Sequence, residues 1–148
     1  MPYDIRPMLA IDIESVVRLD REILGQSIGE IMFRDELENN PFSTYFVMTD
    51  EDSQSIVGHI GVWVDAPLAQ ILNFYLIPEI RRQGLGETLL QYALTYLKSR
   101  YVNTLTLEVR PTNLPAIALY KKYGFHKVAV RKNYYHDGQD ADLMLSDL

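Results

Sequence analysis

The sequence predicts an α/β fold of mixed α+β character, with one mixed central sheet of about seven strands flanked by four helices. Two observations favour this class. The first half supplies a strand, two helices and a hairpin, and the second half alternates strand-length apolar stretches with amphipathic helical ones. That order suits a sheet covered by helices on both faces. No internal repeat or linker interrupts it, so we expect a single domain over residues 1–148.

Polar and glycine-containing segments separate the expected elements of the first half. Asp12 is expected to cap the first helix, and Asn39-Asn40-Pro41 is expected to end the second. The expected ranges are Tyr3–Arg6 for the first strand, Asp12–Glu22 and Glu30–Glu38 for the helices, and Tyr45–Met48 and Ile56–Val64 for the hairpin.

In the second half, the strand Ile71–Ile77 leads through a glycine-containing turn into a long helix. Asn113 and Pro115 mark the start of a further helix, and Gly124 marks its end. The long helix shows one apolar stripe, formed by Leu85, Leu89, Leu90, Ala93, Leu94 and Leu97. The remaining expected strands are Thr104–Val109, Lys127–Arg131 and Ala141–Leu145.

The turn before the long helix reads Arg81-x-x-Gly84-x-Gly86. It combines two arginines, flexible backbone and the unpaired N–H groups of a helix start, which together suit a pyrophosphate. The familiar nucleotide patterns do not fit, because Glu87 and Thr88 follow Gly86 where a Lys-Ser/Thr pair is needed, and a third glycine is missing. The alternative to anion binding is an ordinary strand-to-helix turn whose arginines are solvated.

A second cluster lies further along. Glu108 alternates with the apolar residues of its strand. A partly buried carboxylate at this position suits a general base. The alternative is a carboxylate that is paired with a nearby cation or lies at an open edge of the sheet. Tyr120 lies on the helix that follows. Its alternatives are an apolar core residue and a phenol that donates a proton to a leaving group.

Composition narrows the chemistry. The formal net charge of −6 argues against direct nucleic-acid binding. The chain has no cysteine, which excludes disulfides and a cysteine nucleophile. The three histidines lie far apart in the sequence and lack the spacing of metal ligands, so we expect no metal site. The absence of a long apolar run and of a leader pattern predicts a cytoplasmic protein without a membrane span.

The motifs described above follow one another in an order that resembles the GNAT superfamily of acetyl-CoA-dependent N-acetyltransferases, across nearly the whole chain. Within it, the chain is most similar to the ribosomal-protein-alanine N-acetyltransferases, which acetylate a protein's N-terminal amine. The residues that carry this closer likeness are Leu107–Arg110, Asn113, Ala116–Tyr120 and Arg131–Tyr135.

The resemblance implies acetyl-CoA as co-substrate and no metal. The pyrophosphate would lie at the start of the long helix, the end of the preceding strand would pair with the pantetheine arm, and Asn113 would contact the thiol end. The implied cofactor-binding residues are Phe74, Tyr75, Leu76, Arg81, Arg82, Gln83, Gly84, Leu85, Gly86, Glu87 and Asn113.

The resemblance further implies that Glu108 is the proton acceptor and Tyr120 the proton donor of a direct transfer in a ternary complex. Tyr134 and Tyr135 are expected to line the acceptor groove, with local ring packing as the alternative. Many relatives carry a Pro-Trp pair in a segment that faces the acceptor, and the corresponding Gly25–Gly29 has neither residue.

The expected acceptor is a protein or peptide N-terminus, with a ribosomal protein among the candidates. A lysine side chain, a polyamine or another small amine is the alternative acceptor. A non-catalytic acetyl-CoA sensor is the alternative function, and the sequence leaves the oligomeric state open.

Overall fold

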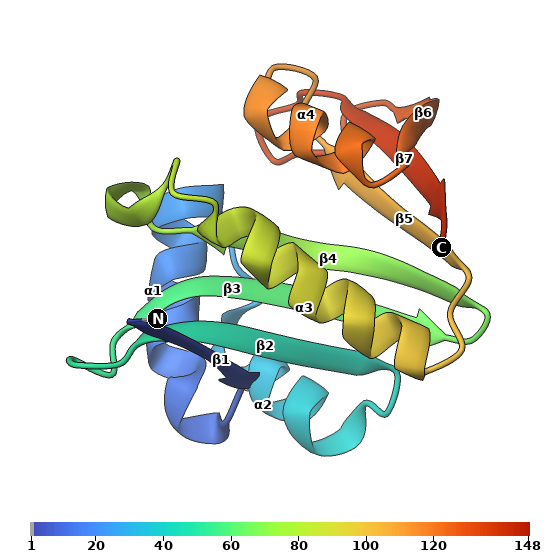
Figure 1. Cartoon of the computed structure of the whole chain (residues 1–148). Coiled ribbons are helices and arrows are strands. Elements are labelled where there is room, and N and C mark those ends of the chain that lie inside the picture. The colour runs from blue at the N-terminus through green and yellow to red at the C-terminus, as the bar shows by residue number, and fades with distance from the viewer. Residues whose placement is uncertain (1) are drawn as a thin grey trace. The chain divides into compact units, whose positions relative to one another are not determined.

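The computed structural model describes residues 2–148 and contains the predicted mixed sheet (Figure 1). Its strands are β1 (Tyr3–Pro7), β2 (Ser43–Asp50), β3 (Ile56–Asp65), β4 (Leu68–Leu76), β5 (Thr104–Val109), β6 (His126–Arg131) and β7 (Ala141–Asp147). Its α-helices are α1 (Ile13–Leu24), α2 (Gly29–Asn39), α3 (Leu85–Ser99) and α4 (Leu114–Lys122).

The seven strands follow the hydrogen-bonded order β1-β2-β3-β4-β5-β7-β6. Strands β4 and β5 pair in parallel, whereas the pairs β1–β2, β2–β3, β5–β7 and β6–β7 are antiparallel. The predicted fold class, a mixed sheet of seven strands with four helices, is therefore confirmed.

The chain divides into two compact units, which are described separately. Unit 1 contains the residues up to Trp63 together with Leu72–Tyr96, and unit 2 contains Val64–Ile71 together with Leu97–Leu148. The two units share strand β4, because its residues up to Ile71 belong to unit 2 and the remainder to unit 1.

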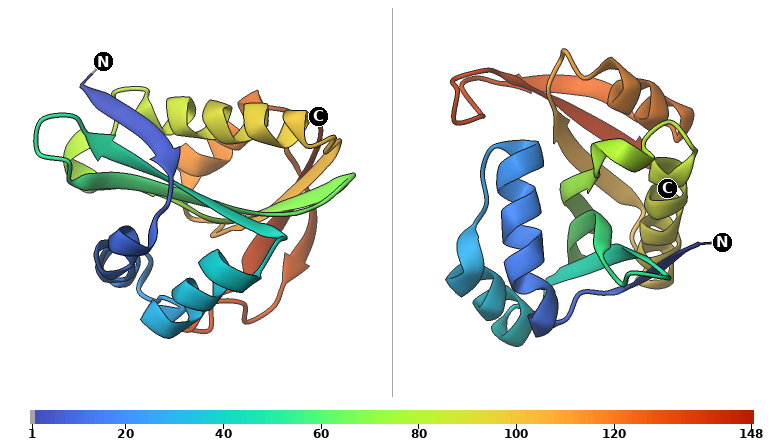
Figure 2. Two further views of the ribbon diagram at one scale, coloured as in Figure 1. Left: turned by 90° about the horizontal axis from the view of Figure 1, so that it is seen from below. Right: turned by 90° about the vertical axis from the view of Figure 1, so that its left-hand side faces the viewer.

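In unit 1, helices α1 and α2 cover one face of strands β1–β3, and the part of α3 up to Tyr96 covers the other (Figure 2). The predicted apolar stripe of α3 is buried along its whole length. Burial of such side chains is the main favourable contribution to folding. The core on the other face contains Met8, Ile13, Val16, Val17, Phe33, Tyr45 and Val47.

Asp12 immediately precedes α1 as predicted, but the prediction that its side chain caps this helix is wrong. Its two carboxylate oxygens accept hydrogen bonds from the Arg6 guanidinium at 2.7 and 2.9 Å, and one also accepts from the Leu9 N–H at 2.8 Å. A bidentate arginine is a stronger partner than a backbone N–H. The side chain therefore joins β1 to the short 3-10 turn Ala10–Asp12 instead.

In unit 2, β5 lies between the first residues of β4 and strand β7, and β6 pairs with the other edge of β7. The predicted start and end of α4 are both confirmed. The Asn113 side chain accepts a hydrogen bond from the Ala116 N–H at 3.3 Å, and Gly124 adopts a left-handed φ of 86° just past the helix. The Ser146 hydroxyl donates to the Tyr123 carbonyl at 2.9 Å and ties this helix end to β7.

One boundary matters for function. Strand β4 begins at Leu68, whereas the sequence predicted a start at Ile71. The polar Gln70 obscured the pattern, although it lies in register with Thr106 of β5. The strand therefore carries an additional polar side chain next to the strand of Glu108.

Candidate active site

The turn before α3 has the backbone geometry that anion binding requires. Arg82 and Gly84 adopt left-handed φ values of 65° and 79°, and residues 81–84 are all exposed. A Cβ on Gly84 would meet no heavy atom within 4 Å, so the space beside it is open. Helix α3 begins at Leu85, and the first N–H groups of a helix have no partner within it. The turn thus presents backbone donors and the positive end of the helix dipole at the surface.

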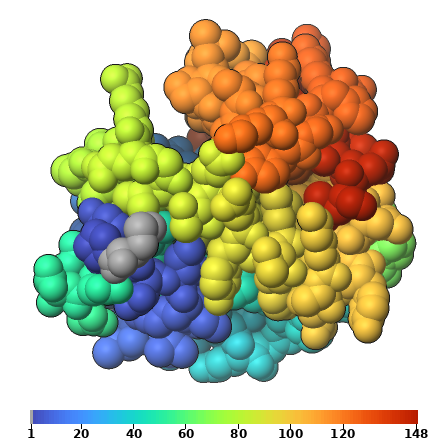
Figure 3. Space-filling model, viewed as in Figure 1, coloured from blue at the N-terminus to red at the C-terminus, as the bar shows by residue number. Residues whose placement is uncertain are grey.

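The segment that carries this turn forms part of the molecular surface, and one of its side chains extends away from it (Figure 3, yellow-green). The Arg81 side chain folds back, and its Nε donates to the Leu76 carbonyl at 3.2 Å. Thr88 also closes the turn, because its hydroxyl and its N–H both donate to the Gly84 carbonyl, at 3.1 and 3.2 Å. These contacts fix the turn at both ends.

The side chains at the end of β4 point into unit 1. Tyr75 and Leu76 are buried, and Phe74 is half-buried. The Tyr75 hydroxyl donates to Asp20 Oδ1 at 2.6 Å, and the Ser27 hydroxyl donates to Asp20 Oδ2 at 3.0 Å. Burial raises the pKa of the Asp20 carboxyl, although both hydrogen bonds act in the opposite direction. One buried carboxylate therefore joins α1, strand β4 and the segment between α1 and α2.

In unit 2, Glu108 lies on β5 on the face opposite the buried Leu107 and Val109, as alternation predicted. Its side chain is only 4% exposed. Both carboxylate oxygens are occupied: Gln70 Nε2 donates to Oε2 at 2.8 Å, and the Arg131 guanidinium donates to Oε1 at 2.7 Å. The structure therefore shows a buried carboxylate that is also paired with a cation, which combines features of both sequence interpretations.

Tyr120 is a buried residue of α4, 6% exposed, with its ring 5.6 Å from that of Phe125. Burial raises the pKa of its phenol above the ordinary value, and the neighbouring Tyr135 acts in the same direction. The core interpretation of this tyrosine is thus correct. It remains compatible with proton donation, because such a phenol stays protonated at neutral pH.

Tyr134 and Tyr135 lie between β6 and β7, with their ring centroids 5.0 Å apart in an edge-to-face arrangement. Arg110 stacks 3.9 Å from the Tyr135 ring centroid and pairs with Asp137 at 3.0 Å. Burial raises the pKa of Tyr135 to about 12, although Arg110 lowers it. Burial and the Glu108 charge raise the pKa of Tyr134. Unit 2 therefore brings both tyrosines into the electrostatic neighbourhood of Glu108.

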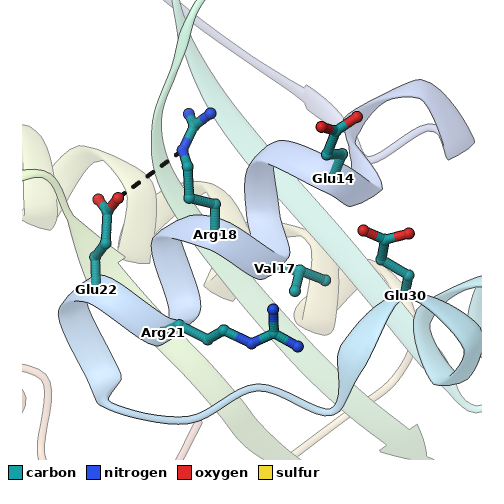
Figure 4. Close-up of a pocket in the computed structure, with 6 residues that line it drawn as sticks. All are labelled: Glu14, Val17, Arg18, Arg21, Glu22 and Glu30. Atoms are coloured by element: carbon teal, nitrogen blue, oxygen red, sulfur yellow. Dashed lines mark ion pairs between the residues drawn. The ribbon is translucent and has the colours of Figure 1, made fainter.

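Two hollows open on the surface of unit 1, with volumes of about 350 and 310 Å³, and both are lined largely by charged side chains. In the larger one, Arg18 and Glu22 lie 4.0 Å apart on the exposed side of α1 (Figure 4). Its lining residues are Glu14, Val17, Arg18, Arg21, Glu22 and Glu30. Neither hollow contains a predicted site residue.

Sequence reasoning missed three residues that contact the predicted site. Gln70 lay outside the predicted strand, and Asp20 was hidden among the charged residues of α1. Arg131 was included in the family likeness but received no role. Only the structure shows which side chain meets which, because these contacts join residues far apart in the chain.

The chain matches the acetyltransferase (GNAT) family over residues 13–125. A protein of Bacillus subtilis strain 168, provisionally named a ribosomal protein bS18-alanine N-acetyltransferase, is 38% identical over 95% of this chain and 92% of its own length. The N-alpha-acetyltransferase of Sulfolobus acidocaldarius is 31% identical over 99% of this chain and 93% of its own. The crystal structure of the ribosomal-protein-S18-alanine N-acetyltransferase from Escherichia coli has a TM-score of 0.84 at 29% identity, over 98% of this chain and 93% of that one.

The chain therefore belongs to the GNAT acetyltransferase family, and it is an N-acetyltransferase. Among the described residues, none of the helices is both long and apolar enough to cross a membrane. The same part of the chain holds no group of three His, Cys, Asp or Glu side chains arranged for a metal ion.

Proposed function

We propose that this enzyme transfers an acetyl group from acetyl-CoA to the N-terminal amine of a protein, and that residues 1–148 act as one catalytic domain. The observation that carries the proposal is the turn before α3, where Arg82 and Gly84 hold left-handed backbone beside an open surface. Such a turn fits a diphosphate. The names of the two relatives and of the solved structure support an N-terminal amine as acceptor.

The residues present at this turn fit the donor. Arg81 to Glu87 hold its diphosphate through the N–H groups at the start of α3 and through the arginine charges. Phe74, Tyr75 and Leu76 offer backbone groups to its pantetheine arm, and Asn113 contacts its thiol end. Acetyl-CoA supplies the reactive thioester in this scheme.

Glu108 is the proton acceptor. An α-amine has a pKa of about 7.7–8.0, so much of it is protonated at neutral pH and cannot attack a carbonyl. The Glu108 carboxylate, directly or through a water molecule, takes a proton from this ammonium and frees its lone pair. Its backbone pairs with Leu143 of β7, and its carboxylate accepts hydrogen bonds from Gln70 and Arg131, which hold it in place.

Tyr120 is the proton donor. Burial raises its pKa, so the phenol carries its proton at every pH at which the amine reacts, and it gives that proton to the departing thiolate. A chain without cysteine has no thiol nucleophile, which agrees with direct transfer to the amine.

We propose a ribosomal protein as the acceptor, because the names of the Bacillus subtilis relative and the Escherichia coli structure both specify one. Tyr134 and Tyr135 contact its first residues, and the reaction takes place in the cytoplasm. The absence of the Pro-Trp pair from Gly25–Gly29 indicates that these first residues differ from those that many relatives accept.

The test is thiol release from acetyl-CoA with a peptide whose N-terminus is free and the same peptide with a blocked N-terminus. We expect turnover only with the free one. Glu108→Gln should lower kcat by roughly 10²- to 10⁴-fold, the usual contribution of a general base, while calorimetry shows unchanged affinity for coenzyme A.

Glu51→Gln is the matched control, because Glu51 lies in the exposed turn between β2 and β3. It should keep wild-type turnover. A blocked peptide that still contains lysine tests the alternative acceptor. If it reacts as fast as the free peptide, the acceptor is a side-chain amine rather than the N-terminal amine. Coenzyme A binding without turnover of any amine would identify a sensor.

A further inference from the structure

The carboxylate of Glu108 is held at both oxygens by residues to which no role has been assigned. Gln70 of β4 donates to Oε2 at 2.8 Å, and Arg131 of β6 donates to Oε1 at 2.7 Å. All three residues belong to unit 2. Each oxygen can accept a second hydrogen bond, but the Arg131 guanidinium at Oε1 repels a second cation, so an approaching ammonium favours its displacement.

The two donors reach Glu108 from opposite sides of β5. Gln70 lies on the neighbouring parallel strand, in register with Thr106. Arg131 lies one strand beyond β7, in register with Ala141, and its side chain reaches across β7 to Glu108. The two hydrogen bonds therefore hold the carboxylate from both sides of β5 and fix its orientation.

The two donors differ in charge and in exposure. Gln70 is neutral and half-buried, so it orients the carboxylate without adding a charge beside it. Arg131 is charged, its side chain is 53% exposed, and every residue of β6 is exposed. Its guanidinium therefore competes with any other cation that approaches the same oxygen.

Arg131 also has a second partner within reach. Its guanidinium carbon lies 5.3 Å from the centroid of the Tyr134 ring, within the range of a cation–π contact. An arginine that leaves Glu108 therefore still has a favourable position on an aromatic face next to it.

The other charged groups near Glu108 already have partners. On β5 itself Arg110 pairs with Asp137, and on β7 Asp142 pairs with Lys127 at 3.3 Å. The charge of the carboxylate also acts on the phenols of Tyr134 and Tyr135, which have raised pKa values. Among these groups, Arg131 is the cation in direct contact with the carboxylate.

We propose that Gln70 and Arg131 are positioning residues of Glu108 with different tasks, on the assumption that the proposed function is correct. Gln70 keeps the carboxylate oriented throughout the reaction. Arg131 occupies the other oxygen in the free enzyme and is replaced there by the ammonium of the acceptor.

This exchange balances charge at each step. The ammonium of the acceptor takes the place of the guanidinium at Oε1, so the buried carboxylate is never without a cation, which would be costly. One proton then passes from the ammonium nitrogen to Oε1, leaving a neutral amine and a neutral carboxyl group. Arg131 stays protonated and rests on Tyr134. A neutral acceptor cannot make this exchange, so Arg131 contributes selectivity for cationic amines.

The experiment compares Arg131→Gln and Gln70→Met in peptide kinetics at several pH values. Removing the competing cation should lower the acceptor KM by about two- to fivefold, the scale of an exposed ion pair. Arg131→Lys keeps the charge and should restore the wild-type acceptor KM.

Gln70→Met keeps the length of the side chain and removes the donor. It should lower kcat by roughly 10- to 100-fold through loss of orientation, with little change in acceptor KM. Gln70→Asn is the second variant, because it keeps the amide but is one methylene too short to reach. Thermal unfolding of each variant shows whether the fold is intact.

Lys132→Gln is the matched control for Arg131. Lys132 is the next residue, 78% exposed, and it pairs with Asp140 rather than with Glu108. Its kinetics should equal those of wild type. In a Glu108→Gln background, Arg131→Gln should change nothing further, whereas a purely structural role would give additive effects.

Two failures can be told apart. If Glu108→Gln is inactive but folded Arg131→Gln and Gln70→Asn match wild type in KM, kcat and pH profile, this inference is wrong and the proposed function stands. If Glu108→Gln is as active as wild type, the assignment of the base itself is wrong.

Discussion

At the residue scale, His59 is the most unusual buried group of unit 1. It is 0% exposed, and neither ring nitrogen has a hydrogen-bond partner among the described residues. Its ring stacks on Tyr45 with 5.7 Å between centroids. Burial lowers the pKa of His59 to about 3, so it is neutral at pH 7, and its 3.9 Å approach to Asp20 is not an ion pair.

This lowered pKa predicts acid sensitivity. An unfolded histidine has a pKa of about 6.5 and binds a proton that the folded one refuses, so stability is lost as the pH falls from about 6.5 towards 3. His59 alone should reduce the free energy of unfolding by about 2 kcal/mol between pH 7 and pH 5. Urea unfolding of wild type and His59→Leu at both pH values measures this loss.

The variant should lose clearly less stability than wild type over that interval. Asp20 acts in the opposite sense, because its raised pKa favours the folded state as the pH falls, so the comparison between the two proteins isolates His59. His126→Leu is the control, because His126 is exposed on β6. If His59→Leu and wild type lost the same free energy of unfolding between pH 7 and pH 5, the prediction would be wrong.

At the element scale, the sequence predicted the turn before α3 well and the strand before it less well. Gly84, Gly86 and the apolar stripe of α3 are local signals, and a local signal needs no knowledge of the rest of the fold. The start of β4 was wrong because Gln70 is polar. A polar residue fits a strand when it has a partner, and that partner, Glu108, lies far along the chain. The same reason explains why Arg131 received no role.

The turn before α3 gives a prediction in which a glycine outside the turn serves as the control. Gly84 and Gly25 have nearly the same left-handed φ, 79° and 80°, and a Cβ on either would meet nothing within 4 Å. Alanine at either position adds only backbone strain of about 1–2 kcal/mol. In Gly84→Ala this strain should shift the exposed turn away from its anion-binding form and weaken coenzyme A binding by about 5- to 30-fold.

Isothermal titration calorimetry measures both variants. Gly25→Ala should bind coenzyme A like wild type, because Gly25 follows α1 rather than the turn. Equal weakening in both variants would assign the effect to general destabilisation. Unchanged affinity in Gly84→Ala would remove the turn from the proposed donor site.

At the scale of the whole molecule, charge distinguishes the two ligands. The chain has 14 basic and 20 acidic residues, a formal net charge of −6. Such a field attracts cationic peptides over distances of about a Debye length, roughly 10 Å at 0.1 M salt. The anionic donor must then be bound by local groups, and we propose the two arginines and the helix start before α3 for this role.

We therefore expect KM for a lysine- and arginine-rich acceptor peptide to rise by about two- to fivefold between low and high salt. A peptide with the same first residue but neutral side chains should change much less. Steady-state kinetics over a salt series, at saturating acetyl-CoA, measures both. An equal salt effect on the two peptides would show that the net charge of the protein plays no part in acceptor binding.

The hydrogen bonds that meet at Asp20 have a consequence for which positions of the neighbouring segment tolerate substitution. Tyr75 donates to one oxygen from β4, the strand proposed to bind the donor, and Ser27 donates to the other from the segment between α1 and α2. Gln26 and Ile28 on either side take no part in this attachment and are exposed. Substitutions at those two positions should therefore leave the attachment of this segment to α1 and β4 intact.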